Sequence, residues 1–163
     1  MTAALLDEDQ ARWLVDNGAS IIVSSCDATG GPSIGQGIGC RVEPDRKRVR
    51  VFMVEARSRQ VLEDLRAGRP IAVVFTHSPT LRSLQLKARH ARLVPLEPGD
   101  RERVDAYVNT VVTQWTYAPE PYVRTLLATG PGELVAIELE PSAAFDQTPG
   151  PQAGVALSKG ARS

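Results

Sequence analysis

The chain of 163 residues is 42% apolar and 23% charged, and its 19 basic side chains balance 19 acidic ones. These values fit one domain with its own hydrophobic core, and they exclude the disordered, collagen-like and membrane-spanning classes. A nucleic-acid-binding protein normally carries a basic excess, so no nucleic-acid partner is expected.

The first half of the chain is predicted to form a helix and then a meander of three strands. Asp7 can cap the helix in a capping box with Gln10, and Gly18 marks the end of the helix. The strands that follow are predicted at residues 20–26, 33–42 and 48–54. Because tight turns join them, we expect the three strands to be antiparallel.

A short helix and two further strands come next. Residues 58–68 have an apolar stripe at helical spacing, with Ser58 as the cap. Residues 70–76 are predicted to be a buried strand, and residues 81–94 one long strand. Alternation along that strand would give an apolar face and a polar face: Leu84, Leu86 and Ala88 against Ser83, Gln85, Lys87 and Arg89.

The clearest helix covers residues 102–115. Its apolar stripe, which we expect to be buried, consists of Val104, Val108, Val111 and Trp115. The charged run 100–103 is interpreted as the solvated start of this helix. A shorter helix at PEPYVRTLLAT and a last strand at 133–140 follow. From residue 144 onward the chain is rich in Pro, Gly and Ser, and it is predicted to have little structure of its own.

About six strands with inserted helices indicate an α+β fold, a mainly antiparallel barrel with flanking helices. The N-terminus lacks a basic start followed by an apolar run, which predicts a cytoplasmic protein without a membrane partner. Cys26 and Cys40 are the only cysteines, and a turn at 27–32 would keep them from facing each other, so no disulfide is expected. The scattered cysteines and histidines give no zinc pattern, and no metal site is predicted.

Two features of the strands favour a ligand site, and each has a structural alternative. The polar, cationic face of residues 81–89 either binds an anionic, hydrogen-bonding ligand or is only solvated. Gly35, Gly37 and Gly39 alternate on one strand, where glycine is normally avoided. A flat ligand or a packed helix could approach the backbone closely there.

Two further features concern residues outside the strands. Arg57, Ser58 and Arg59 lie at a helix start, where free backbone N–H groups favour a phosphate. A simple helix cap with solvated arginines is the alternative. His77 and His90 are candidates for an acid/base group or for a haem or metal ligand, although a surface or packing role is more common for such residues.

The run VRVFMVEARSRQVLEDLRAGRPIAVVF, followed by LRSLQLKARHARLVPLE, resembles the pyridoxamine 5′-phosphate oxidase-like family, the FMN-binding split barrels. The resemblance covers roughly residues 8–145. It implies a mainly antiparallel six-stranded split β-barrel that forms a homodimer, with FMN in a groove between the subunits. Residues 1–150 would be the single FMN-binding domain, and residues 151–163 a flexible C-terminal tail.

The resemblance also assigns cofactor contacts by position. Ser58 and Arg59 match the family's phosphate-binding Ser-Arg pair, and Arg82 matches an arginine at the head of the next strand. Ser83 or Gln85 matches a glutamine that hydrogen-bonds the flavin ring. The full set of candidate cofactor-binding residues is Arg57, Ser58, Arg59, Arg82, Ser83, Gln85, Lys87 and Gly37; no catalytic residue is assigned.

The sequence departs from the family pattern at the phosphate site. Gln60 replaces the lysine after Ser-Arg, and Gly35 and Cys40 align with an arginine and a lysine of the second strand. Each missing charge-assisted contact is worth about 1.5–3 kcal/mol, so flavin affinity is expected to be low or lost.

The leading hypothesis is an FMN-dependent oxidoreductase acting on an unknown small molecule, with Arg82, Lys87 or Arg89 supplying charge for the reduced ring. Haem and the deazaflavin F420 occur among relatives of this fold. One alternative is therefore a haem-binding protein with His77 or His90 as axial ligand, and another is an F420-binding protein. A third is a non-catalytic dimeric binder that has lost its cofactor.

Overall fold

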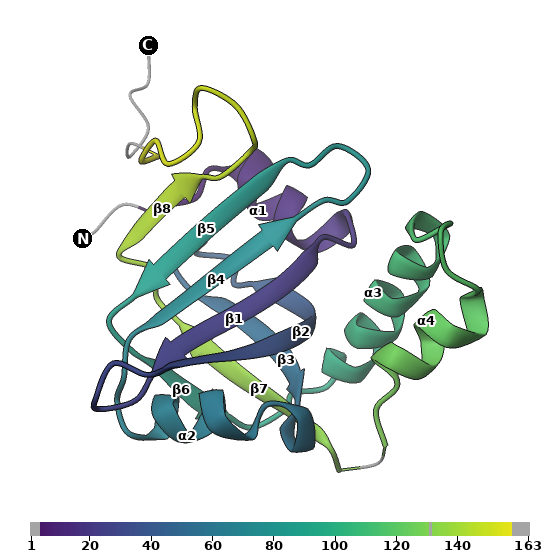
Figure 1. The fold of residues 1–163 in the computed structure, drawn as a ribbon, viewed down its shortest axis with the longest axis horizontal. Helices are drawn as coiled ribbons and strands as arrows, with labels where there is room; N and C mark the ends of the chain where they lie inside the picture. The colour runs from purple at the N-terminus through teal and green to yellow at the C-terminus, as the bar shows by residue number, and fades with distance from the viewer. Residues whose placement is uncertain (1–3, 131, 158–163) are drawn as a thin grey trace.

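The structure is a computed structural model that describes residues 4–130 and 132–157. Its described part contains one antiparallel sheet in the order β6-β7-β3-β2-β1-β4-β5-β8 (Figure 1). The strands are β1 Ser20–Cys26, β2 Pro32–Val42, β3 Val49–Val54, β4 Ile71–Thr76, β5 Ser83–Ala88, β6 Ala91–Val94, β7 Leu134–Leu139 and β8 Ala143–Asp146. The helices are α1 Glu8–Asp16, α2 Arg59–Arg66, α3 Asp100–Gln114 and α4 Glu120–Leu127, and a 3₁₀ turn covers Glu55–Arg57.

The predicted α+β class and the antiparallel arrangement are confirmed, but the prediction of six strands is wrong, because the described sheet has eight. The expected long strand at 81–94 is broken at Arg89 and His90, so that β5 pairs with β4 while β6 pairs with β7. The stretch expected to lack structure begins with β8, which pairs with β5. The edge strands β6 and β8 are not paired with each other within the described residues, so the barrel stays split.

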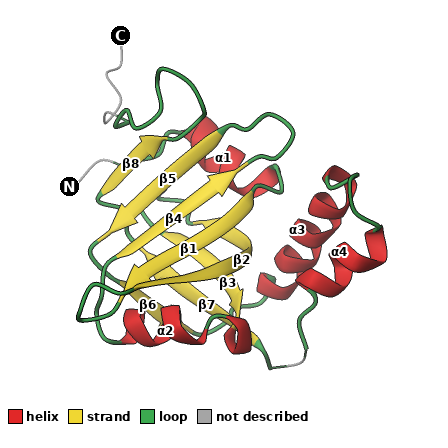
Figure 2. Cartoon of the chain, in the orientation of Figure 1, coloured by secondary structure: helices red, strands yellow, loops and turns green. Residues whose placement is uncertain are grey.

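The core fills the barrel, and helices close it on several sides (Figure 2). Every residue of β3 is buried, and α1 and α3 pack on β2 while α2 packs on β1 and β2. The start of α1 confirms the sequence analysis: Asp7 accepts a hydrogen bond from the Gln10 backbone, and the Gln10 side chain accepts one from the Asp7 backbone. Ser58 lies at the N-cap of α2, but its side chain makes no capping hydrogen bond.

Helix α3 confirms the predicted stripe only in part. Val104 and Val111 are buried, whereas Val108 and Trp115 are half-buried. Asp100, expected to be solvated, is 1% exposed because its carboxylate accepts hydrogen bonds from guanidinium groups that the sheet brings to the helix start. Those donors are Arg41, at 2.9 Å, and Arg50, at 3.4 Å.

Beyond β8 the described chain folds back along that strand. Phe145 bridges to Ala156, and the backbone N–H of Leu157 donates to the carbonyl of Ala144 at 2.8 Å. Residues 158–163 of the predicted tail lie outside the described residues. Cys26 and Cys40 are both free thiols. Among the described residues, no helix has the length and apolar character needed to cross a bilayer.

Candidate functional site

The outward-facing residues of β2, β1, β4 and β5 form a continuous surface, which we call the outer face. Strand register places Gln36, Ile22, Val74 and Gln85 side by side across the four strands. The next row consists of Ile34, Ser24, Ala72 and Lys87. Ile34 is 70% exposed and Ile22 is 36% exposed. No described helix lies over β1, β4 and β5 in the view of Figure 2, so this partly apolar face is uncovered.

A shallow hollow of about 270 Å³ opens at the β2 side of the outer face. It is lined by Ile22, Ile34, Gly35, Gln36, Val54 and Arg57. The outer face therefore has a guanidinium group near one border and, three strands away, the amide of Gln85 and the ammonium of Lys87 near the other. An apolar floor between polar borders suits a flat, amphipathic ligand.

Strand β5 presents the predicted alternation. Its apolar face is buried, and Gln85 and Lys87 point to the outer face. Gln85 Oε1 accepts a hydrogen bond from Gln147 at 3.1 Å, which leaves the Gln85 N–H donors for another partner. The Lys87 ammonium lies 5.0 Å from the centroid of the Phe145 ring. These two side chains are the part of the predicted polar face that a ligand could reach.

The structure separates the other polar residues of this segment from Gln85 and Lys87. Ser83 is buried, and its hydroxyl is within hydrogen-bond distance of Thr76 Oγ1, at 3.0 Å, and of the Leu81 carbonyl, at 3.1 Å. The Arg82 guanidinium lies 4.7 Å from the centroid of the Trp13 ring in α1. Arg89 follows the end of β5 and lines a different hollow.

The three residues predicted to bind a phosphate do not converge on one point. Arg57 donates to the carbonyls of Leu126 and Ala128 and so caps the C-terminal end of α4. The Ser58 hydroxyl is buried and has no hydrogen-bond partner among the described residues. Arg59 is exposed and lines a separate surface hollow. The local sequence favours an anion-binding site, but in the folded protein Arg57 binds the C-terminal end of α4 instead.

The Cα hydrogens of Gly35 and Gly37 that a side chain would replace face the core of the protein, which favours the packing alternative. A Cβ atom at Gly37 would stand 2.6 Å from Ile21 Cγ2 and 2.9 Å from Val51 Cγ1. A Cβ atom at Gly35 would stand 2.7 Å from Met53 Cε. The approaching group is therefore the protein's own core, and a cofactor contact by Gly37 stays a prediction.

Neither histidine lines the hollow on the outer face. His77 directly follows β4, and its Nδ1 atom lies 2.8 Å from Thr80 Oγ1. His90 is exposed in the turn between β5 and β6. Among the described residues, no group of three or more His, Cys, Asp or Glu side chains is placed to hold a metal ion.

Sequence reasoning missed the apolar part of the outer face. In SIIVSSC the buried Ile21 and Val23 alternate with the outward Ile22 and Ser24, but neighbouring isoleucines hide the period of two. Ile34 is not among the predicted ligand-site residues, because its neighbouring glycines point to the opposite side of β2. The available signal was the position of Ile34 itself: a residue between the inward Ser33 and Gly35 has to point outward.

A network of charged side chains, partly buried, connects β2, β3, β6 and β7. Burial acts to raise the pKa of Glu138, but hydrogen bonds from Arg92 and Arg50 outweigh it and hold the pKa below the ordinary value of 4.5. The hydrogen bond from Arg41, followed by that from Arg50, lowers the pKa of Glu97. These carboxylates are therefore ionised at neutral pH and stabilise the arginines around them.

Comparison with known proteins gives structural likeness alone. No family model and no curated protein matches the sequence. HupZ of Group A Streptococcus is 17% identical with a TM-score of 0.56, over 91% of this chain and 100% of its own. A Lactobacillus delbrueckii protein provisionally assigned as a pyridoxamine 5′-phosphate oxidase is 16% identical with a TM-score of 0.52, over 86% of this chain and 93% of its own.

An F420 reductase is 13% identical with a TM-score of 0.51, over 85% of this chain and 98% of its own. At such identities the likeness concerns the fold, and it agrees with the open antiparallel sheet described above. The resemblance seen in the sequence is confirmed at the level of the fold. The chain thus has the split-barrel fold of the pyridoxamine 5′-phosphate oxidase-like proteins.

Proposed function

We propose that the chain forms a homodimer through the outer face and that the groove between the two copies binds a flavin-type ring, in an oxidoreductase acting on a small molecule. The supporting observation is the uncovered outer face, where the exposed Ile22 lies opposite Val74 of β4 and diagonally across from the exposed Ile34 of β2. Contiguous apolar surface of this kind commonly marks an interface, and a two-fold dimer buries the same patch on both copies.

The residues at one border of the outer face fit the ring of a flavin. When bound, the ring supplies hydride or electron transfer. The amide of Gln85, oriented by Gln147, has N–H donors free for a ring carbonyl. Lys87 stands two residues along the same face and would place positive charge near that ring.

The residues at the opposite border do not fit the phosphate of FMN in the arrangement that the resemblance implies. Arg57 is engaged by α4, and the Ser58 hydroxyl is buried. Gln60, which replaces the family's lysine, donates to Asp64 at 3.2 Å. Arg59 is the remaining candidate for the phosphate. We therefore infer a weak phosphate anchor, which allows FMN but equally a deazaflavin such as F420.

The neighbours named as a pyridoxamine 5′-phosphate oxidase and an F420 reductase support both ring types and decide between neither. A haem-binding function would need His77 or His90 to reach the groove, and neither lines the hollow on the outer face. A dimeric binder without cofactor shares the predicted interface. A cytoplasmic location is retained as part of this proposal.

The test combines sedimentation velocity with visible absorption, using purified protein titrated with FMN, F420 and haem. We expect a dimer that binds FMN or F420, and a monomer without ring binding for Ile34→Asp, since that side chain is exposed and its replacement leaves the core intact. Tyr122→Asp, at an exposed aromatic residue of α4, is the matched control and should stay dimeric.

Arg59→Ala should weaken FMN binding about tenfold through loss of a charge-assisted contact, whereas Arg101→Ala should leave FMN binding unchanged.

Several outcomes would overturn the proposal in different ways. A stable monomer, or full ring binding by Ile34→Asp, would refute the intersubunit groove. A Soret band with no flavin uptake would assign the protein to the haem-binding alternative. A dimer that binds neither FMN, F420 nor haem would assign the protein to the alternative of a non-catalytic binder without a cofactor.

A further inference from the structure

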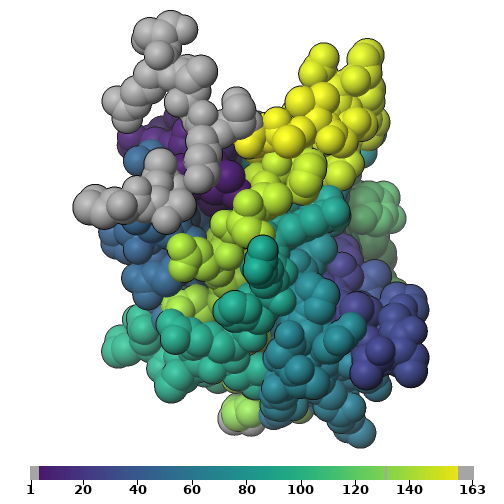
Figure 3. Space-filling model, turned by 90° about the vertical axis from the view of Figure 1, so that its left-hand side faces the viewer, coloured from purple at the N-terminus to yellow at the C-terminus, as the bar shows by residue number. Residues whose placement is uncertain are grey.

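A second and larger hollow, of about 570 Å³, lies at the opening of the split barrel. The chain passes here twice between the two ends of the sheet: Arg89 and His90 connect β5 to β6, and Pro141 and Ser142 connect β7 to β8. Figure 3 views the molecule from this side, with the β7–β8 connection in lime beside the teal of β5 and β6. The β2–β3 hairpin adds further lining residues. We call this site the basic hollow.

Cations outnumber carboxylates among the residues that line the basic hollow. The cations are Lys47, Arg48, Arg89 and Arg92, with His90 beside them, and the carboxylates are Glu138 and Glu140. The hollow also has apolar lining from Leu5, Leu139 and Pro141. A concave site with a cationic excess and some apolar wall has the composition of a pocket for a small organic anion.

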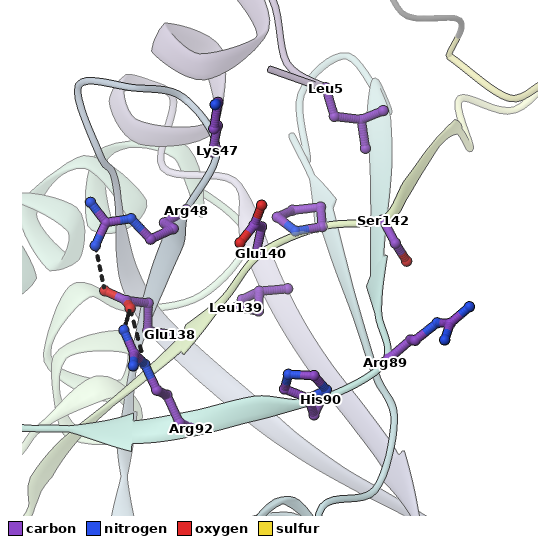
Figure 4. Close-up of a pocket in the computed structure, with 11 residues that line it drawn as sticks. Leu5, Lys47, Arg48, Arg89, His90, Arg92, Glu138, Leu139, Glu140 and Ser142 are labelled. Atoms are coloured by element: carbon purple, nitrogen blue, oxygen red, sulfur yellow. Dashed lines mark hydrogen bonds and ion pairs between the residues drawn. The ribbon is translucent and has the colours of Figure 1, made fainter. Parts of the chain in front are cut away.

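One wall of the hollow is preorganised by a buried carboxylate. Glu138 is 5% exposed and accepts two hydrogen bonds from Arg92, at 2.6 and 3.2 Å. It also accepts one from Arg50, at 3.4 Å, and lies 3.9 Å from the Arg48 guanidinium. Figure 4 shows Arg48 and Arg92 on either side of the Glu138 carboxylate. Glu138 is thus fully used in holding these arginines, whose remaining N–H groups are left for a ligand.

Two further basic side chains that line the hollow have no ion-pair partner among the described residues. Arg89 and His90 are exposed, and neither makes an ion pair with a described residue. In Figure 4, Arg92 and Arg89 lie on either side of His90 along the same stretch of chain, and Glu140 lies above His90. Sequence analysis grouped Arg89 with the β5 face, but the structure turns it into this hollow.

We propose that the basic hollow binds a small molecule bearing two or more linked phosphate groups. Guanidinium groups are the donors best matched to phosphate oxygens, and three of them, from Arg48, Arg89 and Arg92, line this hollow. A single phosphate is too small to contact all the cations around a hollow of about 570 Å³, whereas a polyphosphate chain has acceptors along its length. The balanced charge of the whole chain argues against a nucleic acid as the ligand. None of the lining residues belongs to the hollow on the outer face, so this site is independent of the proposed cofactor groove.

The test is calorimetric titration of the full chain with inorganic tripolyphosphate, orthophosphate and citrate. We expect tripolyphosphate to bind tightest and to weaken as salt is added. Arg89→Gln should weaken it about tenfold or more, and Glu140→Gln should tighten it because a repelling carboxylate is removed. Arg101→Gln removes an exposed arginine outside the hollow and is the matched control, expected to change nothing.

Three results would overturn the proposal. The first is the absence of tripolyphosphate binding at about 1 mM ligand, or equal binding by wild type and Arg89→Gln. The second is orthophosphate or citrate binding as tightly as tripolyphosphate. The third is loss of tripolyphosphate binding in Arg59→Ala, which would place the anion at the helix α2 start instead. Failure of the flavin titration affects none of these readouts.

Discussion

Replacing Gly37 by alanine should destabilise the protein, because the core side chains of Ile21 and Val51 occupy the space that a side chain at position 37 would need. The new Cβ atom would stand 2.6 Å from Ile21 Cγ2, 2.8 Å from Ile21 Cβ and 2.9 Å from Val51 Cγ1. Carbon atoms in contact normally stand about 3.5–4.0 Å apart. Since Ile21 Cβ is fixed to its backbone, the strands themselves have to move, and overpacking of this kind costs about 2–3 kcal/mol.

The lower entropy of the unfolded chain with alanine offsets about 0.4–1 kcal/mol, which leaves a net loss of about 1–2.5 kcal/mol. Gly35→Ala should cost less, because its nearest neighbour, Met53 Cε, is the end of a flexible side chain. Urea unfolding followed by tryptophan fluorescence measures both, with the outward-facing Gln36→Ala as a control expected within about 0.5 kcal/mol of wild type. A Gly37→Ala protein of unchanged stability that had lost its ring ligand would refute this reasoning and restore the glycine face as a ligand surface.

Two further predictions concern the core and the charge network. Val111→Asp should lower the free energy of unfolding by about 3 kcal/mol or more, since this residue is 0% exposed. Val108→Asp should lower it clearly less, because Val108 is half-buried. Equal shifts in Tm for the two variants would contradict the burial assigned to α3. The pKa of Glu138 is lower in the folded than in the unfolded protein, so its stabilising effect is complete above pH 4.5 and is lost as the pH falls through the folded value. The urea midpoint should therefore fall less steeply from neutral to acid pH in Glu138→Gln than in wild type. Parallel pH profiles of the two proteins would argue against the buried pairing.

The sequence was most informative where structure depends on near neighbours. The capping box of Asp7 and Gln10 involves residues three apart, and it is present as predicted. Alternation along β5 placed Gln85 and Lys87 on one face for the same reason. The break between β5 and β6 was missed because Arg89 carries none of the usual turn chemistry of Gly, Pro or Asn.

Features that depend on distant partners could not be predicted in this way. Asp100 begins a helix in a run of charges, a pattern that normally indicates solvent exposure. It is buried because Arg41 and Arg50 of the neighbouring strands β2 and β3 meet it there. Strand β8 has only four residues, and its pairing with β5 fixes it where its composition favours a loop.

The phosphate end of the candidate site shows how such a distant contact changes a functional interpretation. The missing family lysine at Gln60 already predicted a weak FMN phosphate site. The structure adds a second and independent cause, since Arg57 donates to carbonyls of Leu126 and Ala128, residues that lie far along the chain. Those carbonyls form the negative end of α4, so a phosphate that recruited Arg57 would leave that helix end uncapped. An anionic tail in the proposed groove would have to be held without Arg57, which favours a ligand bound mainly through its ring.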